Sequence, residues 1–269
     1  MIPVQSSIAH EADAKDARSP VISVVMTTYN GARHLREQLA SIIEQLGEGD
    51  ELIISDDRST DKTLQILNEH ASERIRIVIT SGKLGPIRNF EHAIGHARGQ
   101  VIVLSDQDDR WLPGRLQRVR DHFAADDTPY NLLVMNSIIA DGELNPTHDS
   151  LFAYLEAGKG LAKNVYRNTY VGCHMAFRRE LLTVAMPFPR AIPMHDMWLG
   201  LVSEMVGAVT FDPTPTLMFR RSGHNYTQTH YPLRQRLVWR LGLITSLLQL
   251  RLSRRFRTRP HRPVAESQA

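Results

Sequence analysis

The sequence has a single cysteine, Cys173, among its 269 residues, so no disulfide bond can form within the chain. It also contains no CxxC pair and no cluster of cysteine and histidine with the spacing of a structural zinc site. A small domain held together by disulfides or zinc is therefore excluded. We expect a protein of a reducing compartment whose hydrophobic core alone holds the fold.

Long hydrophobic runs are also missing. No apolar stretch approaches the roughly 18 to 20 residues that a transmembrane helix needs. Residues 1–20 are polar and mixed in charge and lack the apolar centre of a secretory signal, so we expect a flexible N-terminal segment and a cytoplasmic protein. The first predicted strand is followed by TTYNG and not by GxGxxG, which argues against a dinucleotide-dependent oxidoreductase.

Acidic residues are scarce near the C-terminus. From residue 233 onward the chain has nine arginines and one acid, a net charge of +8. Because the whole chain carries +3, residues 1–232 carry 3 − 8 = −5. The protein is therefore an acidic body with a basic tail, and its basic isoelectric point does not indicate a nucleic-acid-binding protein.

The first part of the chain alternates between apolar, β-branched runs and segments with helical periodicity. This pattern predicts strands over 21–26, 51–55, 75–80 and 101–105, each followed by a helix, over 35–46, 60–71, 87–98 and 113–123. Such strand-loop-helix units favour a parallel, doubly wound α/β sheet. After residue 126 the pattern is looser, with strands expected over 132–135, 170–177, 208–211 and 216–220 and a helix over 197–206.

Three carboxylates follow the fourth predicted strand in the segment SDQDDRW, residues 105–111. Asp106, Asp108 and Asp109 repel one another, and a divalent cation such as Mg²⁺ or Mn²⁺ would supply the missing positive charge. The alternative is that Asp108 or Asp109 caps the next helix. Capping explains one of these acids but not the set, so the segment indicates a metal site.

Polar residues also end the first two predicted strands, which meet the fourth at one edge of such a sheet. Asp56 and Asp57 form a second acidic pair that could accept hydrogen bonds from a ligand base or form an Asx turn. Thr28 and Tyr29 follow the first strand, and the ring of Tyr29 offers a face for stacking. Ordinary packing of this ring is the alternative.

Four segments in order, VVMTTYNGARHL, LIISDDRSTDKT, LGPIRNFEHAIGHARG and VIVLSDQDDRWLPGRL, resemble the amino-terminal half of an inverting family 2 glycosyltransferase. SDQDDxW in particular is similar to the bacterial rhamnosyltransferase-like branch. The resemblance covers about residues 21–225. It implies a GT-A fold, a doubly wound and mostly parallel sheet flanked by helices, with a nucleotide-binding half over 21–125 and an acceptor half over 126–230.

The resemblance also implies roles for particular residues. Asp57, with Asp56 beside it, matches the acid that reads the pyrimidine base, and Arg88 matches a basic position near the ribose or diphosphate. Asp106 and Asp108 match the outer positions of the DxD motif, with Asp108 as the direct metal ligand and Asp106 contacting ribose or metal-bound water. The implied donor site thus consists of Thr28, Tyr29, Asp56, Asp57, Arg88 and Asp106.

An inverting transfer needs a base that takes the proton of the acceptor hydroxyl. Asp196 matches the family position of this base, and it could also cap the helix that follows it. His195 and Trp198 are expected on the acceptor side. Relatives of this branch often carry an aromatic-Arg-x-His-x-x-Asn pattern, where this chain has Ser222 in place of the histidine. His224, two residues later, is a candidate metal ligand; the alternative is a solvated loop histidine.

The basic tail is expected to form an amphipathic helix over 231–258, followed by a disordered end over 259–269. This helix could lie on an anionic cytoplasmic membrane surface or pack on the catalytic domain with its arginines in solvent. Four apolar residues share one stripe of it: Leu237, Leu241, Ile244 and Leu248.

These features predict an inverting, metal-dependent glycosyltransferase. It would move a sugar from a nucleoside diphosphate, dTDP-L-rhamnose by resemblance, to a hydroxyl of a bacterial surface polysaccharide or lipid-linked glycan. The alternatives are a UDP-hexose-dependent transferase of the same family and a degenerate module that binds nucleotide or glycan without turnover. Nucleic acid is not an expected partner.

Overall fold

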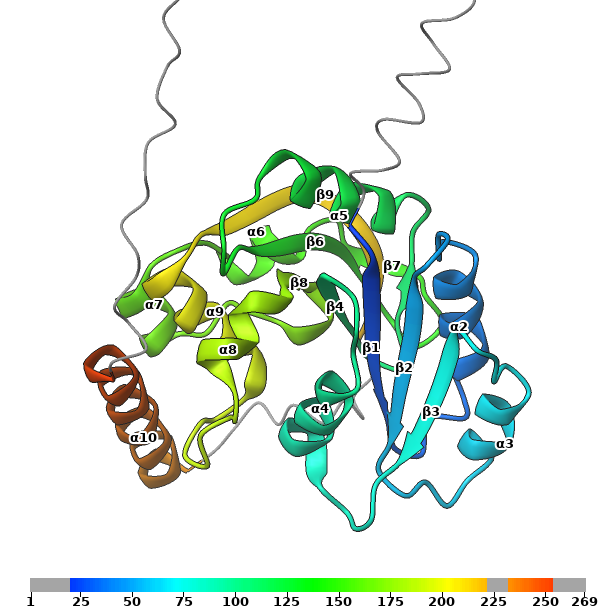
Figure 1. Cartoon of the computed structure of the whole chain (residues 1–269), viewed down its shortest axis with the longest axis horizontal. Helices are drawn as coiled ribbons and strands as arrows, with labels where there is room; N and C mark the ends of the chain where they lie inside the picture. The colour runs from blue at the N-terminus through cyan, green and yellow to red at the C-terminus, as the bar shows by residue number, and fades with distance from the viewer. Residues whose placement is uncertain (1–19, 222–231, 254–269) are drawn as a thin grey trace, which may run out of the picture.

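The structure is a computed structural model that describes residues 20–221 and 232–253. Its centre is one nine-stranded mixed sheet in the order β3-β2-β1-β4-β8-β6-β9-β5, with β7 paired to β6 (Figure 1). Helices cover both faces of the sheet. The predictions for 1–19, for His224 and for 259–269 lie outside the described residues.

The N-terminal half is the predicted doubly wound unit. Its strands β1 (Ile22–Thr28), β2 (Glu51–Asp56), β3 (Ile75–Ile79) and β4 (Val101–Ser105) are parallel neighbours. Strands buried on both faces read as continuous apolar runs, which is why they were predictable. The helices that follow them are α2 (Leu35–Ile43), α3 (Thr63–Asn68), α4 (Gly85–Gly95) and α5 (Arg115–Ala125).

Two hydrophobic cores lie on the two faces of this sheet. One core joins the side chains of α2, α3 and α5 to one face of β1 and β2, and Ile22, Val24 and Met26 of β1 belong to it. The other joins α4 to the elements of the second half and includes Val25 and Phe90. Alternate residues of β1 therefore enter different cores, as the side-chain alternation of a strand requires.

The second half extends the sheet with mostly antiparallel pairings. β8 (Met175–Arg178) lies antiparallel to β4 and to β6 (Leu132–Ala140), and β9 (Val209–Arg220) is parallel to β6. The short strands β5 (Arg110–Trp111) and β7 (Pro146–His148) pair antiparallel with β9 and β6. The helices of this half are α6 (Leu151–Leu155), α7 (Leu161–Tyr166), α8 (Leu182–Ala185) and α9 (His195–Val206).

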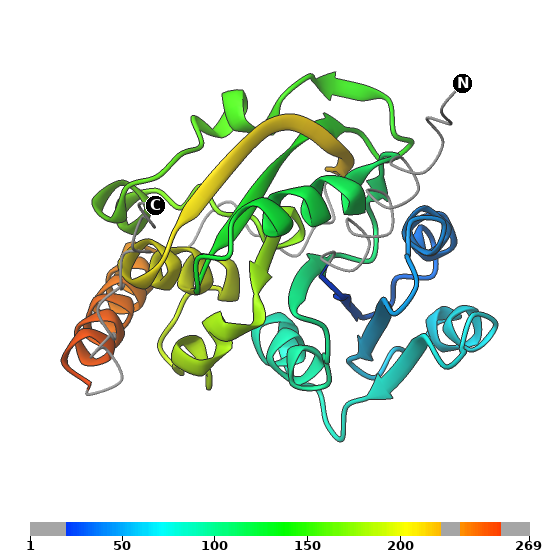
Figure 2. The same cartoon turned by 45° about the horizontal axis from the view of Figure 1, so that its top comes forward.

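Two strand predictions in this half are wrong in detail. The segment predicted as a strand over 170–177 contains the 3-10 turn η1 (Gly172–His174), and only its end is β8; a second turn, η2 (Arg179–Leu181), follows. The strands predicted over 208–211 and 216–220 are one strand, β9, which curves across the molecule (Figure 2). This curve carries Arg220 back to the loop that follows β4.

A final helix, α10 (Leu233–Leu252), packs against the body. Leu243 and Leu247 belong to the second core, and Gly242 allows the close approach, because a Cβ there would lie 2.5 Å from Cβ of Ala191. The tail helix thus packs on the body, and its contact with a membrane stays a prediction. Within the described ranges, no helix has the length and apolar character needed to cross a bilayer.

Candidate functional site

The carboxyl ends of β1 and β2 are tied together by the predicted nucleotide-site residues. The Thr28 hydroxyl donates a hydrogen bond to Asp56 Oδ2 at 2.7 Å. Asp57 accepts hydrogen bonds from the backbone N–H groups of Leu84 and Gly85, at 2.6 and 2.8 Å, where α4 begins. Both carboxylates are buried and engaged within the protein. The structure therefore brings them to the expected edge, and base reading by Asp57 stays a prediction.

Tyr29 presents an exposed ring at this edge. Its side chain is 41% exposed, and Nζ of Lys83 lies 4.0 Å from the ring centroid. The Tyr29 backbone is held by Gln107, whose amide accepts from Tyr29 N–H at 2.9 Å and donates to its carbonyl at 3.1 Å. Gly31 makes room for this contact, since a Cβ there would lie 2.1 Å from Gln107 Oε1. Sequence reasoning missed Gln107, because the sequence does not show that this amide binds the backbone of Tyr29, 78 residues earlier.

The acids after β4 form a compact cluster with the cysteine. One oxygen each of Asp106 and Asp109 and the sulfur of Cys173 all lie within 4.8 Å of one another. Asp109 is 1% exposed, and its Oδ1 accepts a hydrogen bond from the Arg220 backbone N–H. In the described part of the chain, no N–H or O–H group donates to its Oδ2.

Burial and mutual repulsion perturb the titration of this cluster. Burial, together with the charge of Asp108, raises the pKa of Asp106 to about 7. Burial and both neighbouring acids raise the pKa of Asp109 well above its usual value. The same effects raise the pKa of Cys173, so its thiol stays neutral and is not a nucleophile.

The cluster fits a divalent cation in chemical terms. Two carboxylates, one with an unsatisfied buried oxygen, are the hard ligands that Mg²⁺ and Mn²⁺ prefer, and a cation would relieve their repulsion. Asp108, the predicted direct ligand, is not part of this group of three, in which Asp109 stands beside Asp106. Neither Asp108 nor Asp109 caps α5, which begins at Arg115 with Gly114 as its N-cap residue and no side-chain cap.

Two buried arginines support the cluster. Arg220 donates to the Asp108 carbonyl at 2.7 Å and to Glu37 Oε2 at 2.8 Å, which fixes the end of β9 to this loop. Arg115 is fully buried and donates to the Cys173 carbonyl at 2.6 Å. Burial lowers its pKa to about 10, which still leaves it charged near neutral pH. Arg115 had no sequence signal, because a helical arginine is usually exposed.

Asp196, the predicted base, lies in the first turn of α9 and is 9% exposed. Burial raises its pKa to about 7, against the opposing hydrogen bond from Met197 N–H, and the charge of Asp106 raises it further. The backbone beside the cluster also meets the start of α9, since a Cβ on Gly172 would lie 2.8 Å from His195 Nε2. Asn168, which sequence reasoning also missed, lies with Nδ2 3.5 Å from Asp196 Oδ1.

The neighbours of Asp196 on α9 point into the core. His195 stacks on Phe90 with ring centroids 4.1 Å apart, and neither of its ring nitrogens has a hydrogen-bond partner within the described ranges. Burial lowers its pKa to about 3, so the ring is neutral. Trp198 is 2% exposed and donates its indole N–H to the Ala185 carbonyl at 2.8 Å. Their acceptor-side roles stay predictions; in this structure both rings support α9 from inside.

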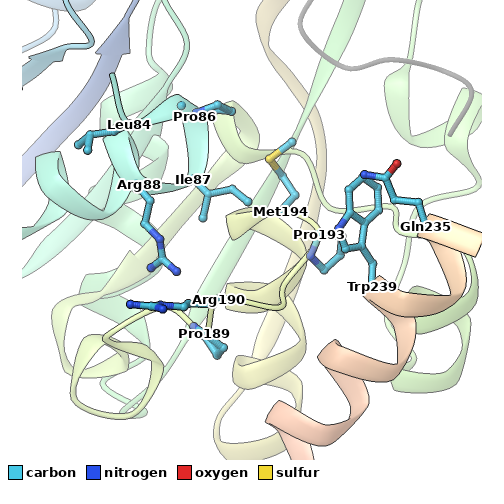
Figure 3. A pocket seen from close by; sticks show the side chains of 11 residues that line it. Leu84, Pro86, Ile87, Arg88, Pro189, Arg190, Pro193, Met194, Gln235 and Trp239 are labelled. Atoms are coloured by element: carbon cyan, nitrogen blue, oxygen red, sulfur yellow. The ribbon is translucent and has the colours of Figure 1, made fainter. Parts of the chain in front are cut away.

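A pocket of about 360 Å³ lies beside the start of α9 (Figure 3). Arg88 of α4 and Arg190 line one end of it, and Trp239 of α10 lines the other. Arg88 also pairs with Glu91. Met194, two residues before Asp196 in the sequence, contributes to the wall, whereas Asp196 itself does not line the pocket.

Comparison with known proteins decides the family. The profile of the family described as "Glycosyl transferase family 2" matches residues 23–184, which is more than half of the chain. The chain belongs to glycosyl transferase family 2. The matched residues include β1 to β4 and the cluster of Asp106, Asp109 and Cys173. Asp196 lies beyond the last matched residue.

Three curated relatives illustrate the similarity of this family-2 chain. The putative teichuronic acid biosynthesis glycosyltransferase TuaG of Bacillus subtilis (strain 168) is 25% identical over 190 residues, 69% of this chain and 73% of TuaG. The putative glycosyltransferase EpsE of the same organism is 37% identical over 102 residues, 37% of each chain. An uncharacterized glycosyltransferase, alr2836 of Nostoc sp. (strain PCC 7120 / SAG 25.82 / UTEX 2576), is 29% identical over 175 residues, 62% of this chain and 53% of that protein. The chain thus spans less than two thirds of two of these three relatives.

Solved structures of S. aureus TarS share the fold of this family-2 chain. TarS 1-349 in complex with UDP-GlcNAc superposes with a TM-score of 0.68 at 18% identity, over 87% of this chain and 68% of that one. The complex with UDP gives a TM-score of 0.66 at 17% identity, over 87% and 67%. At this identity the likeness shows the GT-A-like fold and not the substrate.

Proposed function

We propose that the protein is an inverting glycosyltransferase that uses a nucleoside diphosphate sugar and has Asp196 as its base. The observation that carries the proposal is that Asp196 and the acidic cluster come together from opposite halves of the chain. Gly172, next to Cys173 of the cluster, packs against His195, next to Asp196, since a Cβ on Gly172 would lie 2.8 Å from His195 Nε2. The family supports the reaction class, and the similarity to TarS in its complex with UDP-GlcNAc supports a nucleotide-sugar donor.

In the proposed reaction, the acceptor hydroxyl oxygen forms a bond to the anomeric carbon while that carbon loses its bond to the diphosphate. The hydroxyl proton passes to Asp196, and the nucleoside diphosphate leaves with the electron pair. A base is most effective when its pKa lies near the working pH, and burial raises the pKa of Asp196 to about 7. Asn168 and the first turn of α9 hold the carboxylate in place.

The donor side is assigned to the edge formed by β1, β2 and β4. Tyr29 would stack on the nucleobase, and Thr28, Asp56 and Asp57 would shape the pocket beside it. Mg²⁺ or Mn²⁺, held by Asp106 and Asp109, with Asp108 beside them, would neutralise the charge that develops on the diphosphate. His224 is kept as a further candidate ligand from the sequence.

For the donor sugar we propose L-rhamnose from dTDP-L-rhamnose, on the resemblance of SDQDDxW to the rhamnosyltransferase-like branch. A UDP-hexose is the second candidate, supported by the TarS complex with UDP-GlcNAc. The proposed acceptor is a hydroxyl of a bacterial surface polysaccharide or lipid-linked glycan, which the name of TuaG supports. It would approach through the Trp239 end of the pocket, on the cytoplasmic side of the membrane, while Arg88 at the other end stays assigned to the donor diphosphate.

A donor panel tests the proposal. Purified protein is mixed with dTDP-L-rhamnose, UDP-GlcNAc and other nucleotide sugars in Mg²⁺, Mn²⁺ or EDTA, and thermal stabilisation and release of nucleoside diphosphate are measured. We expect metal-dependent stabilisation and release with one donor class, and loss of both in Asp106→Asn. Stabilisation without any release would favour the binding module, and release that is unchanged in EDTA would remove the metal assignment.

Asp108→Asn and Asp109→Asn, compared at equal folded fraction, separate the two candidate ligands. We expect Asp109→Asn to weaken metal-dependent nucleotide binding, because Asp109 has the unsatisfied oxygen beside Asp106. If only Asp108→Asn weakens it, the ligand assignment from the family motif holds in its original form.

A further inference from the structure

Helix α10 carries apolar side chains on two sides. On the packed side, Leu243 is fully buried and Leu247 is 8% exposed. At about 100° per residue, Leu241, Leu248 and Leu252 lie roughly 140–180° around the helix from Leu243. Their side chains are 64%, 53% and 83% exposed. The contact of α10 with the body therefore leaves a second apolar face uncovered.

This outer face of α10 consists of six exposed apolar residues: Leu237, Val238, Leu241, Ile244, Leu248 and Leu252. It contains the stripe that the sequence identified. The stripe does not hold the helix on the body; that contact is made by Gly242 against Ala191 and by Leu243 and Leu247. Ordinary packing of the tail helix thus explains the buried side and leaves the outer face unexplained.

The charge of α10 has one sign. The helix contains four arginines and no acid, and the sequence from residue 233 onward has nine arginines and one acid. Arg234, Arg236 and Arg251 are exposed and form no ion pair with any residue in the described ranges. An occupant of the outer face must accept leucines and supply negative charge at the same time.

We propose that the outer face of α10 is the surface by which this protein lies on an anionic lipid bilayer. Its leucines would enter the boundary between headgroups and acyl chains while the arginines contact anionic headgroups, as in other interfacial helices. A second copy of the chain fits the outer face less well, because it would bring arginines of the same sign together. Nucleic acid would leave the leucines exposed.

The proposed surface also orients the pocket. Gln235 and Trp239 of α10 line the pocket together with Met194, which precedes the candidate base by two residues in the sequence. The thickness of one helix, about 10 Å, therefore separates the lipid surface from this pocket. An acceptor anchored in the membrane would meet the pocket without leaving the bilayer. The docking itself does not depend on sugar transfer, so it can hold or fail independently of the proposed function.

Vesicle co-sedimentation of the full chain tests this surface. The vesicles are phosphatidylcholine alone or phosphatidylcholine mixed with phosphatidylglycerol. We expect binding to the mixed vesicles only, weakened by salt. The double variant Leu241→Ser/Leu248→Ser should bind at least about tenfold more weakly, because two exposed leucines no longer enter the lipid. Arg234→Gln/Arg251→Gln should lose about fivefold for each arginine removed.

Ile79→Ser is the matched control. Ile79 is 56% exposed, close to the 53% of Leu248, but it belongs to β3, an edge strand of the sheet, and not to α10. This variant should bind vesicles as the wild type does. Equal melting temperatures show that all variants are folded. The proposal would be overturned if the wild-type protein did not co-sediment with anionic vesicles, or if the leucine variant bound them as tightly as the wild type. So would a change from dimer to monomer in the leucine variant with vesicle binding unchanged.

Discussion

Replacement of Asp196 by Asn should inactivate the protein and stabilise it above neutral pH. Burial raises the pKa of Asp196 from 3.8 to about 7. Below pH 3.8 the carboxyl is protonated in both the folded and unfolded states, and it costs nothing. Between pH 3.8 and 7 the unfolded state loses this proton while the folded state keeps it, so the cost grows with pH across this range. Above pH 7 the folded state holds a buried charge and the cost is complete. A difference of about 3 pKa units corresponds to about 4 kcal/mol, and this is the upper limit of the gain from Asn.

The assay is thermal or urea unfolding of wild type and Asp196→Asn at pH 5 and pH 8 without metal. In a domain of this size, 1 kcal/mol shifts Tm by about 2–4 °C, so Asn should raise Tm at pH 8 by several degrees. The gain at pH 5 should be smaller. Asp121→Asn, on the exposed side of α5, is the matched control and should show no such difference. Equal gains at both pH values, or no gain at pH 8, would refute the reasoning.

Three further predictions concern activity. The rate of transfer should rise with pH through about 7, since only ionised Asp196 accepts a proton; a rate that falls over pH 6 to 8 would contradict the role of Asp196 as base. Gly31→Ala should raise the donor KM severalfold, because its Cβ would displace Gln107, and a wild-type KM would show that this contact does not shape the site. Tyr29→Ala should weaken donor binding by about 1–3 kcal/mol while Tyr29→Phe should not, as titration calorimetry with the nucleotide can measure; equal losses would argue against stacking.

The sequence predicts the first half of the fold closely because its strands are buried on both faces and each is followed by a helix. The second half is less regular for identifiable reasons. Pro213 and Pro215 suggest a break, yet β9 continues through them because the pairing with β6 shifts register there. The 3-10 turn at Gly172–His174 interrupts an apolar run that otherwise resembles a strand.

For the site, too, the sequence predicts which residues take part but not which of them lie together. The motif places Asp106, Asp108 and Asp109 at the right edge, but which two acids lie together depends on Arg220, whose backbone N–H fixes Asp109 from 111 residues away. The apolar stripe of the tail helix can likewise be predicted from the sequence. Which face of the helix packs on the body depends on Gly242 lying against Ala191. Tertiary contacts of this kind leave no trace in local sequence.

The most direct test of the central claim is steady-state release of nucleoside diphosphate in the presence of donor, metal and acceptor, for wild type and Asp196→Asn. The account predicts turnover by wild type and a kcat lowered by about 10² to 10⁴ in Asp196→Asn, the usual contribution of a positioned base, with donor KM unchanged. Turnover of Asp196→Asn at the wild-type rate would contradict the assignment of the base on which the proposed reaction rests.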